Sequence, residues 1–264
     1  MLRKTALITG ASGGIGRATA RLLAQSGADL ILHGHTGGAS LDSLVVELKS
    51  HRPTANITAV YGDLSLKAEQ DRLMADMSNL CSVPDVLVLA AGCDLMSAAM
   101  KQLSFEERFA KLWQIDVVSA LRLSRFFGER MKKRLRDQAS SANTEAQRES
   151  QGVIIFFGWD GVEHGMSGET AQLYAAAKGA VQGFSRSLAR SLAPEVRVNC
   201  AAPGWIKTTW GETASPATDE RLAAESLARR WGTAEDVAQL VQFLISDAAA
   251  YINNQTVFVN GGRE

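Results

Sequence analysis

The chain has 264 residues, 46% of them hydrophobic, and its 28 basic side chains balance its 28 acidic ones. This length and composition suit one globular domain spanning 1–264. A net charge of zero argues against a nucleic-acid partner, because such partners select basic surfaces. No apolar run approaches the roughly 20 residues that cross a bilayer, and no secretory signal is visible, so we expect no membrane partner.

Cysteine usage points in the same direction. The three cysteines are odd in number and widely spaced, at Cys81, Cys93 and Cys200. Such spacing indicates a reducing compartment, with neither a disulfide framework nor a paired zinc site. We therefore expect a cytoplasmic enzyme or small-molecule binder without a bound metal.

Short apolar runs alternate with segments of 3.6-residue periodicity. The apolar runs predict strands over 5–9, 30–32, 57–61, 86–90, 153–157, 196–200 and 256–259. The periodic segments predict helices over 14–25, 41–50, 68–80, 105–134, 171–192 and 234–246. Nearly all-apolar strands between helices indicate a parallel sheet covered on both faces. The prediction is an α/β fold, a single doubly wound Rossmann-type domain with seven strands; a closed eight-fold barrel fits less well.

One stretch departs from this alternation. Residues 130–136 carry five basic side chains in seven, and 137–151 then run polar with no large apolar residue. We interpret them as an overlong helix end followed by a solvated loop. A docking site for an acidic partner is the weaker alternative.

A glycine-rich turn lies between the first predicted strand and the first predicted helix. Gly10 permits a tight turn, Gly14 lets the backbone approach a pyrophosphate, and Gly16 lets the helix pack against the strand. The helix N-terminus offers N–H groups to phosphates. The turn therefore predicts a dinucleotide site.

Tyr174 and Lys178 are four residues apart on a predicted helix, so they share one face. Together with the Gly-x-x-x-Gly-x-Gly turn, Arg197-Val-Asn199, Pro203-Gly204 and Asn260-Gly-Gly262, they make the chain resemble the short-chain dehydrogenase/reductase family. The resemblance runs from Lys4 to Gly262 and extends to members such as 3-oxoacyl-carrier-protein reductases.

The resemblance implies a nicotinamide site with Tyr174 as acid/base and Lys178 holding the ribose. The lysine ammonium and an oxidised nicotinamide together are expected to lower the tyrosine pKa. Thr208 corresponds to the residue that holds the carboxamide, and Asp63 to an acid that contacts adenine. Asp63 is alternatively a helix cap. The expected cofactor-binding residues are Gly10, Ser12, Gly14, Ile15, Gly16, His35, Asp63, Leu64, Ala90, Ala91, Gly92, Tyr174, Lys178, Pro203, Gly204, Ile206 and Thr208.

NADP(H) is expected over NAD(H). NAD enzymes usually place a carboxylate at the end of the second strand, whereas here no acid occurs from Leu32 until Asp42. A 2′-phosphate is thus permitted, with His35, Thr36, Ser12 and Arg17 as candidate contacts. Each of these is also an ordinary loop or helix-surface residue.

The rest of the family's polar tetrad is replaced. Trp159 or Asp160 stands where the family has a serine that binds the substrate carbonyl, and Asp116 stands where it has an asparagine. In relatives this asparagine helps to hold a water that connects the lysine to solvent. Asp116 can bind that water and keep Lys178 charged, or it can be structural. Asp160 or His164 is a candidate stand-in for the serine, whose nearest alternatives, Ser167 and Thr170, are expected in a loop farther out. Leu89-Ala90-Ala91-Gly92 similarly replaces the family's Asn-Asn-Ala-Gly.

The segment 208–227 corresponds to the family's variable substrate region. Trp205, Trp210 and Met166 are candidates to line an apolar pocket with Trp159 at its floor, or they simply pack. The expected reaction is hydride transfer between nicotinamide and a small uncharged or apolar carbonyl or alcohol. The alternative is a dinucleotide-binding sensor or oligomer partner with little turnover. A homotetramer or homodimer is expected from the resemblance of Phe243–Ile245 and Gly261-Gly262 to a family interface.

Overall fold

A computed structural model describes residues 4–35, 39–81, 83–141, 151–208 and 214–263. Within them, seven strands form one parallel sheet in the order β3-β2-β1-β4-β5-β6-β7. The order reverses direction between β1 and β4, which is where doubly wound folds bind ligands. The strands are β1 Thr5–Thr9, β2 Asp29–Gly34, β3 Ile57–Tyr61, β4 Val86–Leu89, β5 Gly152–Phe157, β6 Val196–Pro203 and β7 Thr256–Val259. The sheet is open, so the barrel alternative is wrong.

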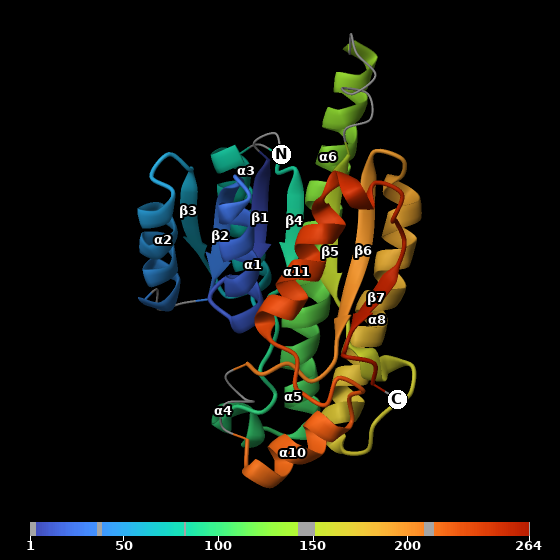
Figure 1. The fold of residues 1–264 in the computed structure, drawn as a ribbon. Coiled ribbons are helices and arrows are strands. Elements are labelled where there is room, and N and C mark those ends of the chain that lie inside the picture. The colour runs from blue at the N-terminus through green and yellow to red at the C-terminus, as the bar shows by residue number, and fades with distance from the viewer. Residues whose placement is uncertain (1–3, 36–38, 82, 142–150, 209–213, 264) are drawn as a thin grey trace.

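Helices cover both faces of the sheet, as Figure 1 shows. On one face lie α1 Gly14–Gln25, α2 Ala39–His51 and α11 Ala234–Ile245. On the other lie α3 Lys67–Cys81, α5 Phe105–Leu112, α6 Ser119–Ser141 and α8 Glu169–Leu192. The shorter elements are α4 Ala98–Lys101, η1 Trp113–Val118, η2 Asp160–Val162, α10 Pro216–Ala224 and η3 Asp247–Ala249.

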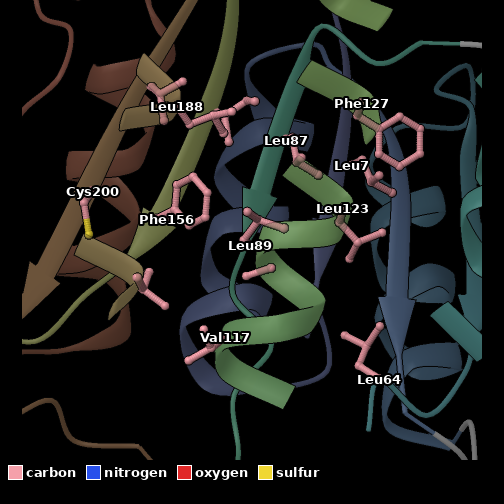
Figure 2. Packing of buried hydrophobic residues seen from close by; sticks show 14 of the residues in the cluster. Leu7, Leu64, Leu87, Leu89, Val117, Leu123, Phe127, Phe156, Leu188 and Cys200 are labelled. Carbon is pink, nitrogen blue, oxygen red and sulfur yellow. The ribbon is translucent and has the colours of Figure 1, made fainter. Parts of the chain in front are cut away.

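The core consists of two apolar clusters, one on each face of the sheet. In Figure 2, Phe127 of α6 lies beside Leu7 of β1 and Leu87 of β4, and Phe156 of β5 lies near Cys200 of β6. All five side chains are fully buried. This packing fixes the carboxyl ends of β1, β4 and β5, which carry the candidate site.

Several predicted boundaries need correction. The helix predicted over 105–134 is broken by the π-helical turn Trp113–Val118, and α6 continues to Ser141. The first part of the polar stretch predicted as a loop is therefore helical. The short helices α4 and α10 were not predicted, because neither is long enough to show a periodicity.

The basic stretch 130–136 lies on α6, which projects from the end of the domain opposite α4 and α10 (Figure 1). Arg134 donates to Asp85 at 2.7 Å, and Arg136 donates to Glu195 at 2.6 Å. Arg130 lies 3.5 Å from the centre of the Phe126 ring. These contacts agree with a helix end held by local pairs; residues 142–150 lie outside the described part of the chain.

None of the described helices is both long enough and apolar enough to cross a membrane.

Candidate active site

The glycine turn has the shape that the sequence predicts. Gly10 adopts a φ of +65°, and a Cβ there would lie 2.6 Å from Ala91 Cα. A Cβ on Gly16 would lie 2.3 Å from Gly10 O. Helix α1 starts after Gly13 with no side-chain cap, so its N-terminus keeps N–H groups for an anion. These observations fit a bound pyrophosphate.

Thr208 lies opposite this turn, since a Cβ on Gly14 would lie 3.1 Å from Thr208 Cγ2. The structure thus brings together two candidate cofactor contacts, Gly14 and Thr208, that are far apart in the chain. Ile206, which follows β6, forms an isolated parallel bridge with Gly232. Trp210 and Thr36 lie outside the described residues.

His33 is a residue of this region that sequence reasoning missed. Its Nδ1 accepts from Gly10 N–H at 3.4 Å, and its Nε2 lies 3.0 Å from the carbonyl oxygen of Gly62. The two contacts require the tautomer that carries its proton on Nε2. Burial lowers the His33 pKa to about 4, so the ring is neutral at pH 7 and ties the turn to the end of β3. A histidine inside an otherwise apolar strand was the available signal.

The end of β2 has no carboxylate in the position that selects NAD. Asp42 instead accepts from the Tyr61 hydroxyl. His35 Nε2 lies 3.5 Å from Asp63 Oδ2, and Arg17 donates to Ser40 Oγ at 2.7 Å. Both side chains therefore already have partners within the protein.

Asp63 accepts from Ser65 N–H at 2.8 Å, just before α3. Burial acts to raise the Asp63 pKa, but the Ser65 bond and nearby His35 outweigh it and hold the pKa below its usual value. The contact agrees with the capping alternative. The Leu64 side chain is buried in the core, and its carbonyl oxygen accepts from Gln70 Nε2 at 2.6 Å.

The turn after β4 lies directly beside the glycine turn. Ala91 N–H donates to the Thr9 hydroxyl at 3.2 Å, so a β1 side chain steadies this turn although the family asparagine is missing. Ala90 and Ala91 are partly exposed and Gly92 is exposed. All three can approach a ligand through their backbones.

Tyr174, Lys178 and Asp116 meet on the other side of this turn. The Lys178 ammonium lies 5.3 Å from the centre of the Tyr174 ring and 2.8 Å from Asp116 Oδ2. Asp116 Oδ1 accepts from Cys93 N–H at 2.7 Å. The Asp116 side chain is completely buried and that of Lys178 is 6% exposed, so the two charges form a buried ion pair. The π-helical turn Trp113–Val118 carries Asp116.

This environment sets the proton affinity of the pair. Burial lowers the Lys178 pKa, but Asp116 and Tyr174 outweigh it, so the net shift is upward. The Tyr174 ring keeps part of its surface exposed, yet burial by the surrounding protein raises its pKa, and the Lys178 charge only partly offsets this. Without a cofactor the net shift of the Tyr174 pKa is therefore upward, while Lys178 acts in the expected downward direction. The expected lowering by lysine together with an oxidised nicotinamide stays a prediction.

Trp159, one of the two candidates for the position of the family's serine, packs on the Tyr174 ring. The two ring centres are 5.5 Å apart in an edge-to-face arrangement. Trp159 is 6% exposed, and a Cβ on Gly161 would lie 2.4 Å from its ring. The tryptophan therefore fixes one side of the Tyr174 ring by packing.

Asp160 does not face the tyrosine partners. Its Oδ1 accepts from Arg263 Nη1 at 3.3 Å, and its Oδ2 accepts from Asn260 Nδ2, also at 3.3 Å. A Cβ on Gly204 would lie 3.0 Å from Asp160 Oδ2. Burial raises the Asp160 pKa against the opposing effect of Arg263. Both carboxylate oxygens thus have partners from the end of the chain.

The remaining candidates for the serine role lie elsewhere. His164 and Ser167 are exposed. Thr170 is not in a loop, as the sequence predicted, but in the first turn of α8, where it accepts from Arg108 Nη2 at 2.7 Å. Among the described residues, no three His, Cys, Asp or Glu side chains are grouped as metal ligands.

The aromatic candidates on the substrate side pack on one another. The Trp205 and Trp231 ring centres are 6.2 Å apart, and Trp205 Nε1 donates to Glu225 Oε2 at 2.8 Å. Met166 is 37% exposed. Trp231, which the sequence analysis did not single out, is 7% exposed and donates to the backbone of Asp219 at 3.1 Å.

An open parallel sheet with a glycine turn and a Tyr-Lys pair at its carboxyl edge defines a dinucleotide-dependent oxidoreductase. The chain belongs to the short-chain dehydrogenase/reductase family, since residues 10–264 match a model of that family described as enoyl-(acyl carrier protein) reductase. It is an NAD(P)-dependent dehydrogenase/reductase.

Several relatives match almost the whole chain. An uncharacterized oxidoreductase, YmfI of Bacillus subtilis, is 32% identical over 99% of each chain. The 3-oxoacyl-(acyl-carrier-protein) reductase FabG of Escherichia coli is 33% identical over 98% of this chain and 96% of its own. A putative NAD(P)-dependent gluconate 5-dehydrogenase from Beutenbergia cavernae, solved with bound NADP at low occupancy, aligns with a TM-score of 0.82 and 29% identity, covering 98% and 96%.

Proposed function

We propose that the protein transfers hydride between NADP(H) and a small uncharged or apolar carbonyl or alcohol, with Tyr174 as the acid/base and Lys178 assisting. The observation that carries the proposal is the Lys178 ammonium over the Tyr174 ring, beside the glycine turn. A protein that only bound a dinucleotide would need the turn and the lysine but not the phenol.

The cofactor is assigned to the carboxyl edge of β1, β4 and β6. Gly10, Ser12, Gly14, Ile15 and Gly16 would hold the pyrophosphate through backbone groups. The nucleoside would be held by His35, Asp63 and Leu64, the middle by Ala90, Ala91 and Gly92, and the nicotinamide half by Pro203, Gly204, Ile206, Thr208 and Lys178. When bound, a reduced nicotinamide supplies the hydride that the carbonyl carbon accepts.

The protonated Tyr174 then acts as the proton donor to the carbonyl oxygen. Burial, with help from the Asp116 charge, raises its pKa and keeps the phenol protonated at pH 7. Lys178 stays charged because its pKa is also raised, chiefly by Asp116. We assign Asp116 as a positioning residue, since its carboxylate fixes the direction of the ammonium.

After β5, where the family places the serine that polarises the carbonyl, this chain has Trp159 and Asp160. Removing one such donor typically costs about 10²- to 10³-fold in rate, so we expect a modest kcat on simple ketones. Trp159 packs against Tyr174 and favours flat apolar substrates. Asp160 was predicted to be catalytic, but its contacts with Arg263 and Asn260 favour a different role.

The preference for NADP(H) rests on the strand end without an acid, where Asp42 is engaged by Tyr61. The NADP bound to the Beutenbergia cavernae structure supports it. The single-domain extent 1–264, the homotetramer or homodimer and the cytoplasmic location stay predictions from the sequence.

The test is a fluorescence titration with NADPH and NADH, followed by a panel of ketones and 3-oxoacyl esters. We expect tighter binding of NADPH and its oxidation by at least one uncharged carbonyl. Tighter binding of NADH would overturn the cofactor preference. Binding without turnover across the panel would favour the sensor.

A further inference from the structure

The penultimate residue of the chain connects three parts of the substrate side. Arg263 Nη1 lies 3.3 Å from Asp160 Oδ1, and its Nη2 lies 3.2 Å from Glu225 Oε2. Asp160 follows Trp159 in the segment after β5, whereas Glu225 is the C-cap of α10. One guanidinium therefore joins the segment after β5 to helix α10, which lies within the segment 208–227 that corresponds to the family's substrate region.

Both carboxylates are held for this contact by other groups. Asp160 is 3% exposed and also accepts from Asn260. Glu225 accepts from Trp205 Nε1 through Oε2 and from Arg221 through Oε1, each at 2.8 Å. These other hydrogen bonds orient each carboxylate independently of Arg263. The two ion pairs of Arg263 therefore have a defined geometry, unlike a loose pair on the surface.

The backbone of the same segment repeats the connection. Leu227 N–H donates to Gly262 O at 3.3 Å, and Ala228 N–H donates to Gly261 O at 3.0 Å. The Ser226 hydroxyl also donates to Gly261 O, at 2.9 Å, and Ser226 pairs with Arg263 in an antiparallel bridge. The last residues of the chain thus run alongside the segment after α10. Figure 1 places the C-terminus at the end of the domain that carries α10.

The guanidinium is shielded by candidate substrate-side residues. Its carbon lies 5.1 Å from the centre of the Trp205 ring, and Nη2 lies 3.9 Å from Met166 Sδ. The Arg263 side chain is only 15% exposed. Its two charge pairs are therefore less screened by water than an ordinary surface salt bridge.

We propose that Arg263 is a positioning residue that fixes helix α10 against the end of β5 and so sets the width of the substrate side. Asp160 serves as the anchor of this bridge rather than as a proton donor. Substrate binding then depends on the bridge, whereas cofactor binding at the glycine turn does not. This kinetic consequence rests on the proposed function; the bridge itself does not.

The structural test needs no substrate. Trp205 contacts both Arg263 and Glu225, so its fluorescence reports on the bridge. We expect Arg263→Ala to shift the emission to longer wavelength and to speed proteolysis within 216–224. Trp205→Phe should remove most of the spectral shift. Arg136→Ala, which breaks the Arg136–Glu195 pair at the other end of the domain, is the matched control and should change neither readout.

Two further variants separate the bridge from general loss of packing. Arg263→Lys keeps the charge but cannot reach two carboxylates with fixed geometry, so it should fall between wild type and Arg263→Ala. Arg263→Ala leaves Asp160 buried without its cation, and adding Asp160→Asn should therefore restore part of the lost stability. If Arg263→Ala fails to fold, Arg263→Lys and Glu225→Gln carry the same two readouts.

Kinetics then test the consequence for the substrate. With a ketone that the wild type reduces, Arg263→Ala should raise KM about tenfold, with kcat and NADPH affinity changed less than about twofold. Unchanged fluorescence, proteolysis and KM would overturn the proposal, as would an equal loss of NADPH affinity. If no ketone is reduced but the fluorescence and proteolysis change as expected, the proposed function fails and the bridge stands.

Discussion

The nucleotide side and the reaction side of the molecule depend on different kinds of residue. At the glycine turn, the proposed dinucleotide site depends on the absence of side chains, because a Cβ on Gly10 or Gly16 would strike backbone atoms. Around Tyr174, the proposed function depends on charges, with Lys178 and Asp116 paired and buried. The glycine turn has the residues of the family motif, because only glycine fits its backbone shape. Around Tyr174 one polar side chain can stand in for another, as Asp116 does for the family's asparagine.

The largest effect is expected on the reaction side. Asp116→Leu leaves the Lys178 ammonium buried without its carboxylate and Cys93 N–H without its acceptor. We expect a loss of about 3–5 kcal/mol in the free energy of unfolding, measured by urea denaturation. A loss below 1 kcal/mol would show that the pair does not hold this region together.

Asp116→Asn sharpens the same point, because the amide still accepts from Cys93 but carries no charge. The Asp116 charge raises the Tyr174 pKa, so its removal lowers that pKa. Alcohol oxidation needs the phenolate, and its rate should therefore rise at a lower pH than in the wild type. The pH profile of oxidation measures this; a shift to higher pH would contradict the assigned role of Asp116.

On the nucleotide side, Gly16→Ala should act through shape alone. Its Cβ would lie 2.3 Å from Gly10 O, a backbone atom that cannot turn away. We expect a loss of about 3 kcal/mol in unfolding free energy and weaker NADPH binding. Gly183→Ala on α8 is the matched control: nothing lies within 4 Å of its Cβ, and it should gain up to about 1 kcal/mol. Similar results for the two variants would refute the argument from shape.

His33 is the exception to the comparison, a titratable side chain behind the glycine turn. Its pKa in the folded state is about 4 against an ordinary 6.5, so the unfolded chain binds the proton first as pH falls. The wild type should lose about 3 kcal/mol of stability between pH 6.5 and pH 4 that His33→Asn does not lose. Denaturation of both proteins across this range checks the difference. Parallel curves of unfolding free energy against pH would mean that folding does not lower the His33 pKa.

The sequence predicts the fold well because the strands are apolar and the turns are marked by glycine. It also predicts that Tyr174 and Lys178 lie close together, because residues four apart on a helix share a face. It does not predict that Asp160 pairs with Arg263, because 103 positions separate them and neither lies in a periodic pattern. The His33 contacts were missed for the same reason, because their partners come from distant segments. Helix α10 was missed because its nine residues are too few to show a periodicity.

The central claim is that the Tyr174 hydroxyl, held beside Lys178, gives its proton to a carbonyl next to NADPH bound at the glycine turn. Its most direct test is a single-turnover reaction, in which protein loaded with NADPH is mixed with a reducible ketone and the NADPH absorbance is followed. Tyr174→Phe should bind NADPH as the wild type does and oxidise it about 10²- to 10⁴-fold more slowly. Equal rates in the two proteins would contradict the account.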